Sequence, residues 1–248
     1  MHDLIHRAAQ DLAGTQNVVA LTGAGISVES GIPPFRGKGG LWEKIDPMEF
    51  AHIDAFMKNP AKVWNVLVRE MKGLLDHARP NNAHLGLARL EELGILKTII
   101  TQNVDGLHQM AGNTDIIEFH GNFAWCVCMD CNRRRQTAQI DLAQIPPRCI
   151  CGGVYKPDCV FFGEMILPQH LLRSEQVASS CDIMLAIGTS AEVQPAAFMP
   201  VIAKQAGAKV IEINPEKTLL TQRTSDYIIP GKAGEIMNLL TAAIERLL

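Results

Sequence analysis

The sequence predicts an α/β fold, a doubly wound parallel sheet of the Rossmann-like kind with a smaller zinc-binding and helical insert domain. Apolar strands alternate with amphipathic helices along most of the 248 residues, as in sheets covered by helices on both faces. Two segments interrupt this alternation, one helical and one rich in cysteine. We therefore expect residues 1–36, 80–121 and 156–248 to form the Rossmann-like domain, with 37–79 as the helical insert and 122–155 as the zinc-binding insert.

Composition indicates a globular protein with enough apolar mass for a sizeable core, since 47% of the residues are hydrophobic and 20% are charged. The net charge of −3 argues against a nucleic-acid-binding surface, and the short run Arg133 to Arg135 is expected to be a solvated patch. No apolar stretch approaches the roughly 20 residues that cross a bilayer, and the N-terminus has no signal pattern. We expect a cytoplasmic protein with no nucleic-acid or membrane partner. Because the chain has no long extensions, we also expect a monomer.

The first predicted elements are a helix over Asp3 to Ala13 and a strand over Val18 to Leu21, which runs into Gly23-Ala24-Gly25. This loop begins like a phosphate-binding loop, but Val28 stands where the third glycine of a dinucleotide fingerprint would be. Two prolines then follow within ten residues and disfavour a long helix.

The middle of the chain predicts helices from Leu41 to Ala78, interrupted at Pro60, and a further helix that ends at Gly94. The strands "LKTIITQN" and "IIEFHG" follow, and each ends in polar side chains. Such residues can line a ligand site at the carboxyl ends of parallel strands. The alternatives are an Asn/Asp turn cap and a hydrogen-bonded structural histidine. The residues concerned are Gln102, Asn103, Asp105 and His120.

After the cysteine-rich segment, helices are expected over Pro168 to Ser179 and Pro195 to Gln205, and a last one from Ala233. Between them lie the strands "DIMLAIGTS" and "AKVIEIN", and then "YIIPG". The strand ends offer hydroxyl, amide and acidic groups, which suit phosphate and ribose. Together with the glycine loop they describe a dinucleotide lying across the sheet. The residues are Gly188, Thr189, Ser190, Asn214 and Glu216.

Five of the seven cysteines fall within one short segment, which indicates a local metal site. Cys128 and Cys131 have the two-residue spacer of a four-thiolate zinc site, whereas Cys149 and Cys151 have only one residue between them. Cys126 is therefore an alternative ligand, and free thiols or a redox pair are alternatives to metal. A four-cysteine site is closed, so the ion would be structural.

The motifs "GAGISVESGIPPFRG", "TQNVDGLH", "HGN", the cysteine quartet, "VFFGE", "GTS" and "INPE" occur in the order and spacing of the sirtuins, which the chain resembles over nearly its whole length. The resemblance implies an NAD-dependent protein lysine deacylase, most simply a deacetylase, that transfers the acyl group to ADP-ribose and releases nicotinamide. One alternative is a mono-ADP-ribosyltransferase or NAD hydrolase on the same fold. Another is a non-enzymic NAD sensor or zinc-ribbon interaction module.

The resemblance also implies residue roles. His120 would be the general base on the ribose hydroxyls, Asn103 would orient water and ribose, and Asp105 would hold the nicotinamide amide. One structural Zn²⁺ would be bound by Cys128, Cys131, Cys149 and Cys151. The implied cofactor-binding residues are Gly23, Ala24, Gly25, Ser27, Phe35, Arg36, Gln102, Asn103, Asp105, Gly188, Thr189, Ser190, Asn214, Glu216, Lys232 and Ala233.

An acyl-lysine protein or peptide is the implied substrate, and its backbone would pair as a strand between Val160 to Glu164 and the segment after Ser190. Sirtuins that remove succinyl groups carry a Tyr and an Arg three residues apart on the helix after the cofactor loop. An ungapped comparison places Leu67 and Glu70 at those positions. We therefore expect acetyl or longer uncharged acyl groups to be preferred over succinyl.

Overall fold

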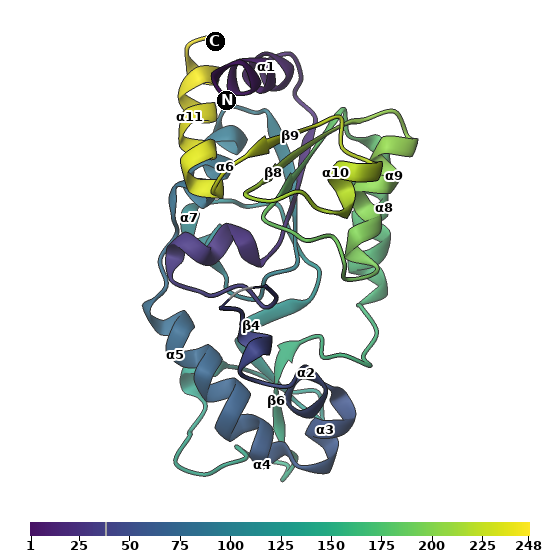
Figure 1. Cartoon of the computed structure of the whole chain (residues 1–248). Helices are drawn as coiled ribbons and strands as arrows, with labels where there is room; N and C mark the ends of the chain where they lie inside the picture. Colours follow the sequence, from purple (N-terminus) through teal and green to yellow (C-terminus); the bar gives the residue numbers. More distant parts are fainter. Residues whose placement is uncertain (38) are drawn as a thin grey trace.

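The computed structural model describes residues 1–37 and 39–248, and its larger sheet has six parallel strands (Figure 1). The strand order, β3-β2-β1-β7-β8-β9, is the Rossmann order once the strands are renumbered within this sheet. The predicted fold class is confirmed. The strands are β1 (Val18–Thr22), β2 (Leu96–Thr101), β3 (Ile116–Glu118), β7 (Ile183–Ile187), β8 (Lys209–Asn214) and β9 (Tyr227–Pro230).

The strand order reverses at β1, because the chain continues to β2 on one side and reaches β7 on the other. Leu21 of β1 pairs with Ile100 of β2 and with Ala186 of β7, so the three strands end at the same level. In such sheets the crevice at the reversal point is where ligands bind. The loops that leave these three strands are therefore the ones that can form a site.

Both faces of the large sheet are covered by helices. Val18 and Ala20 of β1 face the core under α1, α6 and α11, whereas Val19 and Leu21 face the core under α8 and α9. Figure 1 shows these two groups of helices on opposite sides of the sheet. None of the helices in the described part of the chain has the length and hydrophobicity needed to cross a bilayer. The helices that accompany the large sheet are α1 (His2–Ala13), α6 (Asn82–Glu92), α7 (Leu107–Ala111), α8 (Pro168–Ser180), α9 (Met199–Gln205), α10 (Leu219–Arg223) and α11 (Ala233–Glu245).

The smaller unit lies at the far end of the molecule in Figure 1 and combines both inserted segments. Its antiparallel sheet has the order β5-β4-β6. Phe56 and Trp64 of the helical segment share one core with Phe123 and Tyr155 of this sheet, and the Trp64 indole donates a hydrogen bond of 2.8 Å to the Tyr155 carbonyl. Its elements are α2 (Pro47–Phe50), α3 (Ile53–Lys58), α4 (Pro60–Val63), the π-helical turn η3 (Trp64–Val68), α5 (Arg69–His77), β4 (Gly121–Cys128), β5 (Arg134–Gln136) and β6 (Tyr155–Cys159).

Short helical turns complete the structure, and they are where it differs most from the sequence-based expectation. The expected loop after Gly23 contains a 3₁₀ helix, η1, which ends at Gly31 with a left-handed φ of 87°. The five-residue helix α10 was not predicted, because it is too short to show a helical period in the sequence. The 3₁₀ turns are η1 (Ala24–Ser30), η2 (Leu41–Glu43), η4 (Thr137–Gln139) and η5 (Ala196–Phe198).

Candidate active site

A cavity of about 1090 Å³ lies between the strand ends of the large sheet and the smaller unit. This volume is at the upper end of small-molecule sites, as expected if a dinucleotide and a second substrate share it. Most of the predicted cofactor-binding residues line it. They are Gly23, Ala24, Gly25, Phe35, Arg36, Gln102, Asn103, Gly188, Thr189, Ser190, Asn214 and Glu216, and His120 joins them.

The loops after β1 and β7 pack backbone against backbone at the base of the cavity. The Gly23 amide donates to the Ile187 carbonyl at 3.1 Å, and the Gly25 amide donates to the Gly188 carbonyl at 2.8 Å. Gly188 has a φ of 60°, and a Cβ atom there would lie 2.3 Å from the Ile26 nitrogen. A side chain is therefore excluded here, and the close backbone approach fits a loop that cradles phosphate groups of NAD.

A network of polar side chains joins the loop after β1 to the loop after β2. The Asn103 side-chain amide donates to Gly23 O and to Ser27 Oγ, both at 3.1 Å, and Ser27 Oγ donates to Asp105 Oδ2 at 2.7 Å. Burial raises the pKa of Asp105, while hydrogen bonds from the Leu107 amide and the Ser27 hydroxyl act in the opposite direction. The orientation of Asn103 is therefore fixed by Gly23 and Ser27, and Asp105 is joined to it through Ser27.

His120 follows β3 and lines the cavity. Its Nδ1 lies 3.0 Å from the Gln102 carbonyl oxygen, which can only accept a hydrogen bond, so Nδ1 carries the proton and Nε2 is the basic nitrogen. Burial lowers the pKa of His120, and the bond to Gln102 opposes this shift in part. The imidazole is therefore neutral near pH 7 and able to accept a proton.

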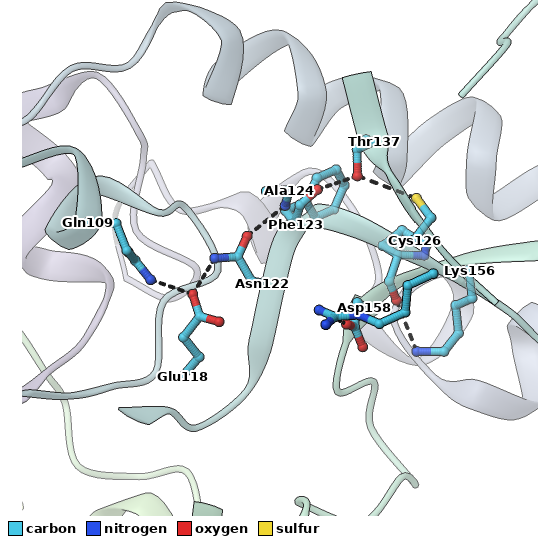
Figure 2. A network of polar contacts seen from close by, with 11 residues as sticks. Gln109, Glu118, Asn122, Phe123, Ala124, Cys126, Thr137, Lys156 and Asp158 are labelled. Atoms are coloured by element: carbon cyan, nitrogen blue, oxygen red, sulfur yellow. Dashed lines mark hydrogen bonds and ion pairs between the residues drawn. The ribbon is translucent and has the colours of Figure 1, made fainter. Parts of the chain in front are cut away.

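Polar contacts fix Glu118 and Asn122, which flank His120 in the sequence, and Figure 2 shows the contacts of these two residues. The Gln109 amide donates to Glu118 Oε1 at 2.6 Å, and the Asn122 amide donates to the same oxygen. Asn122 Oδ1 in turn accepts from the Ala124 amide at 2.7 Å. These bonds connect α7, the end of β3 and the start of β4, so His120 sits at the junction of the two sheets.

The remaining predicted cofactor-binding residues lie elsewhere in the structure. Four of the predicted cofactor-binding residues are not among those that line the cavity: Ser27 and Asp105, which belong to the network around Asn103, and Lys232 and Ala233, at the start of α11. Leu67 lines the cavity, but Glu70 is exposed and Met71 takes the place expected for it. Residues three and four apart both lie on one helix face, so the spacing alone did not decide between Glu70 and Met71.

Several apolar lining residues were missed by sequence reasoning. They extend the cavity into the smaller unit and are contributed by η2, α5, β4 and the loop after β2. An apolar residue in a core and one on a cavity wall have the same sequence signal, so only the packing distinguishes them. The main ones are Trp42, Met71, Val104 and Phe123.

Four cysteine sulfur atoms lie within 4.8 Å of one another: Cys128, Cys131, Cys149 and Cys151. Sγ of Cys128 is 3.5 Å from that of Cys151, and Sγ of Cys131 is 3.8 Å from that of Cys149. Sulfurs at the corners of a zinc tetrahedron are about 3.8 Å apart, so the group fits one Zn²⁺. The alternative ligand Cys126 instead contacts Thr137 Oγ1 at 3.4 Å, and burial raises the pKa of its thiol to about 11.

Comparison with known proteins places this cavity in a family context. The Sir2 family pattern matches residues 23–195. The chain is 44% identical over 238 residues to NAD-dependent protein deacylase 1 of Archaeoglobus fulgidus, covering 96% of each protein. It is 42% identical to the NAD-dependent protein deacylase of Pyrococcus furiosus, covering 98% of this chain and 99% of the relative.

Solved structures agree with these relatives. A Sir2 homologue in complex with NAD is 43% identical, with a TM-score of 0.91 over 98% of this chain and 97% of that one. A Sir2 protein with a deacetylated p53 peptide and 3′-O-acetyl-ADP-ribose is 32% identical, with a TM-score of 0.88 over 94% of this chain and 96% of that one. Sir2Af2 bound to a myristoylated histone peptide is 37% identical, with a TM-score of 0.83 over 100% of this chain and 98% of that one.

Proposed function

The chain belongs to the Sir2 family, and we propose that it is an NAD-dependent protein lysine deacylase, in the first place a deacetylase. The observation that carries this proposal is a neutral His120 on the wall of a cavity that the glycine loop after β1 also lines. When bound, NAD supplies the acceptor, since its ADP-ribose takes the acyl group as nicotinamide leaves. The relatives named as NAD-dependent deacylases support the assignment.

The residues around the cavity have separate tasks in this proposal. The backbone of Gly23 to Gly25, with Thr189 and Ser190, binds the phosphates, and Asn214 and Glu216 bind ribose hydroxyls. Asn103 orients the sugar and a water molecule, and Asp105 binds the nicotinamide amide. His120 Nε2 accepts the proton of a ribose hydroxyl and so makes that oxygen nucleophilic. Cys128, Cys131, Cys149 and Cys151 hold a structural zinc ion that takes no part in the chemistry.

We propose that an acyl-lysine peptide enters between Val160 to Glu164 and the segment that includes Glu192 and Val193, both of which line the cavity. Pairing as an added strand would recognise the peptide backbone rather than its sequence. The related structure that holds a myristoylated histone peptide supports an acylated peptide as substrate. We also propose that the chain divides into the expected domains and is a monomer. We propose further that it is cytoplasmic and binds neither nucleic acid nor membranes. Reduced zinc thiolates suit such a compartment.

The central test replaces the proposed base. His120→Ala should lower kcat for deacetylation at least about 100-fold, the range that general bases contribute, while the dissociation constant for NAD stays within a few-fold of wild type. In the wild-type enzyme, kcat should fall on the acid side with an apparent pKa below the ordinary value of histidine, about 6.5, because burial lowers the pKa of His120. His77→Ala, an exposed histidine at the end of α5, is the control. If His120→Ala deacetylated the peptide as fast as wild type, His120 would not be the general base. If the wild-type enzyme released nicotinamide without any peptide, the ADP-ribosyltransferase or NAD hydrolase alternative would be favoured.

The acyl preference has its own test. Leu67, Met71 and Phe123 present an apolar wall, on which a succinyl carboxylate would lose hydration without a cationic partner. We expect kcat/KM for acetyl, propionyl, butyryl and myristoyl versions of one peptide to exceed that of the succinyl version by at least about tenfold, equal to roughly 1.4 kcal/mol. Mass spectrometry of the acylated ADP-ribose product measures this. Faster removal of succinyl than of acetyl would contradict the preference.

A further inference from the structure

An ion pair joins a buried lysine of β6 to the last residue of the segment Val160 to Glu164. Lys156 of β6 and Glu164 approach to 2.9 Å between Nζ and Oε2, and the two side chains are 8% and 25% exposed. The Lys156 ammonium also donates to the Cys159 carbonyl at 2.7 Å and lies 4.5 Å from the Phe161 ring centroid. A lysine this well buried needs such partners, since its charge has left water.

The same carboxylate closes the turn at the end of the segment. Glu164 Oε2 accepts a hydrogen bond of 2.8 Å from the Phe161 amide, and the Glu164 amide donates to the Phe161 carbonyl at 3.0 Å. The segment is tied at two further points, because the Val160 amide donates to the His120 carbonyl and the Phe162 amide to the Ala51 carbonyl, both at 2.9 Å. Lys156 is therefore the side chain that links β6 to a stretch of backbone held beside His120.

Stability alone does not explain the ion pair between Lys156 and Glu164. Replacing a buried ion pair by apolar residues is often neutral or stabilising, so the pair is poor support for stability alone. Its bonds converge on the Cys159 carbonyl and on the Phe161 amide, which flank Val160. Val160, Phe161 and Gly163 in turn line the cavity, so what fixes this backbone also fixes one wall of the site.

We propose that Lys156 is a positioning residue for the acyl-peptide substrate: through Glu164 it fixes the backbone of Val160 to Glu164 on which the peptide pairs. This rests on the proposed function, because the peptide is the ligand of that function. The ion pair also connects the small sheet to the active site. Lys156 belongs to β6, and β6 pairs with β4, which carries the zinc ligand Cys128.

The test is a double-mutant cycle with Lys156→Met, Glu164→Gln and the double variant, measured with acetyl-peptide and with NAD. Each single variant should raise KM for the peptide about five- to twentyfold, equal to about 1–1.8 kcal/mol, and leave the dissociation constant for NAD unchanged. The double variant should be no worse than either single one, because Lys156 acts through Glu164. Glu164→Gln keeps the size and an acceptor for the Phe161 amide, so it tests the proposal even if Lys156→Met does not fold.

The matched control is Arg134→Met. It breaks the ion pair between Arg134 and Asp158, 2.7 Å apart and on the neighbouring part of the same sheet, but it does not reach Val160 to Glu164. Its peptide KM should equal that of wild type. Three results would each overturn the inference: an unchanged peptide KM in Glu164→Gln, additive increases in KM in the double variant, or an increase in Arg134→Met as large as in Glu164→Gln. Absence of deacetylation in wild type would instead refute the proposed function, so the two failures are distinguishable.

Discussion

The two sheets of this molecule are held together in different ways. The large sheet is buried on both faces, and apolar side chains of all its central strands are shielded from water. The small sheet has only three strands, its edge strand β5 is exposed throughout, and two of its four metal-binding cysteines are exposed. The large sheet therefore keeps its shape through its own core, whereas the small sheet depends on a metal ion and on the core that it shares with the helical insert.

The largest expected effect comes from removing the metal. Cys131→Ala deletes an exposed ligand and leaves no internal cavity, so its consequences come from loss of zinc. We expect the metal content to fall from about one ion per chain to none, proteolysis to begin within residues 122–155, and deacetylation to fall at least about 100-fold. The large sheet should remain folded, as measured by circular dichroism.

The control for this experiment is Cys126→Ala. Cys126 is buried in the same sheet but lies outside the ligand group. It should lose about 1 kcal/mol of stability and keep its zinc. If Cys131→Ala retained zinc, or if Cys126→Ala lost it, the ligand assignment would be wrong.

What the sequence could predict follows the same division. The buried strands of the large sheet are recognisable because short, continuous runs rich in β-branched residues, such as Leu96–Thr101, are typical of strands covered on both faces. Once these strands were recognised, the polar residues at their carboxyl ends could also be located, because the carboxyl ends of parallel strands lie at the same edge of a sheet. In the small sheet only the cysteine spacing was informative. The link between Lys156 and Glu164 has no sequence signal, because its eight-residue separation spans a strand and a turn and so follows no single period. It exists only because the chain turns after β6.

The second prediction tests the rigid backbone junction of the large sheet. Gly188→Ala places a methyl group 2.3 Å from the Ile26 nitrogen and 2.6 Å from the Gly25 carbonyl carbon, atoms that cannot move without displacing the cofactor loop. The left-handed φ adds about 1–2 kcal/mol. We expect a loss of about 3–5 kcal/mol in the free energy of unfolding, and a dissociation constant for NAD at least about tenfold higher, measured by denaturant titration and calorimetry.

Gly112→Ala is the matched variant, since Gly112 also has a left-handed φ, 106°, but a Cβ atom there meets nothing within 4 Å. It should cost only the backbone strain, about 1–2 kcal/mol, and leave NAD binding unchanged. Equal effects of the two variants would show that crowding between the loops after β1 and β7 does not matter.

The smallest effect concerns a pair of buried histidines beneath the cofactor loop of the large domain. His84 and His108 are 0% and 1% exposed, and their ring centroids are 4.9 Å apart. His108 Nε2 lies 3.0 Å from Thr22 Oγ1, next to Gly23. Burial lowers the pKa of His84 to about 4 and that of His108 to about 3, so both are neutral in the folded protein. In the unfolded chain both titrate near the ordinary value of about 6.5.

The folded state therefore binds fewer protons than the unfolded state below about pH 6.5. The stability that these neutral histidines provide is complete above that pH and is lost progressively as the pH falls toward about 4, at up to about 1.4 kcal/mol per pH unit for each histidine. Urea titrations at pH 7.5 and 5.5 should show this loss in wild type and a smaller one in His84→Asn, while His6→Asn, at an exposed position of α1, should behave as wild type. If the free energy of unfolding depended on pH in the same way in wild type and in His84→Asn, the loss of stability in acid would arise from other groups. The buried histidines would then not limit the stability of the large domain.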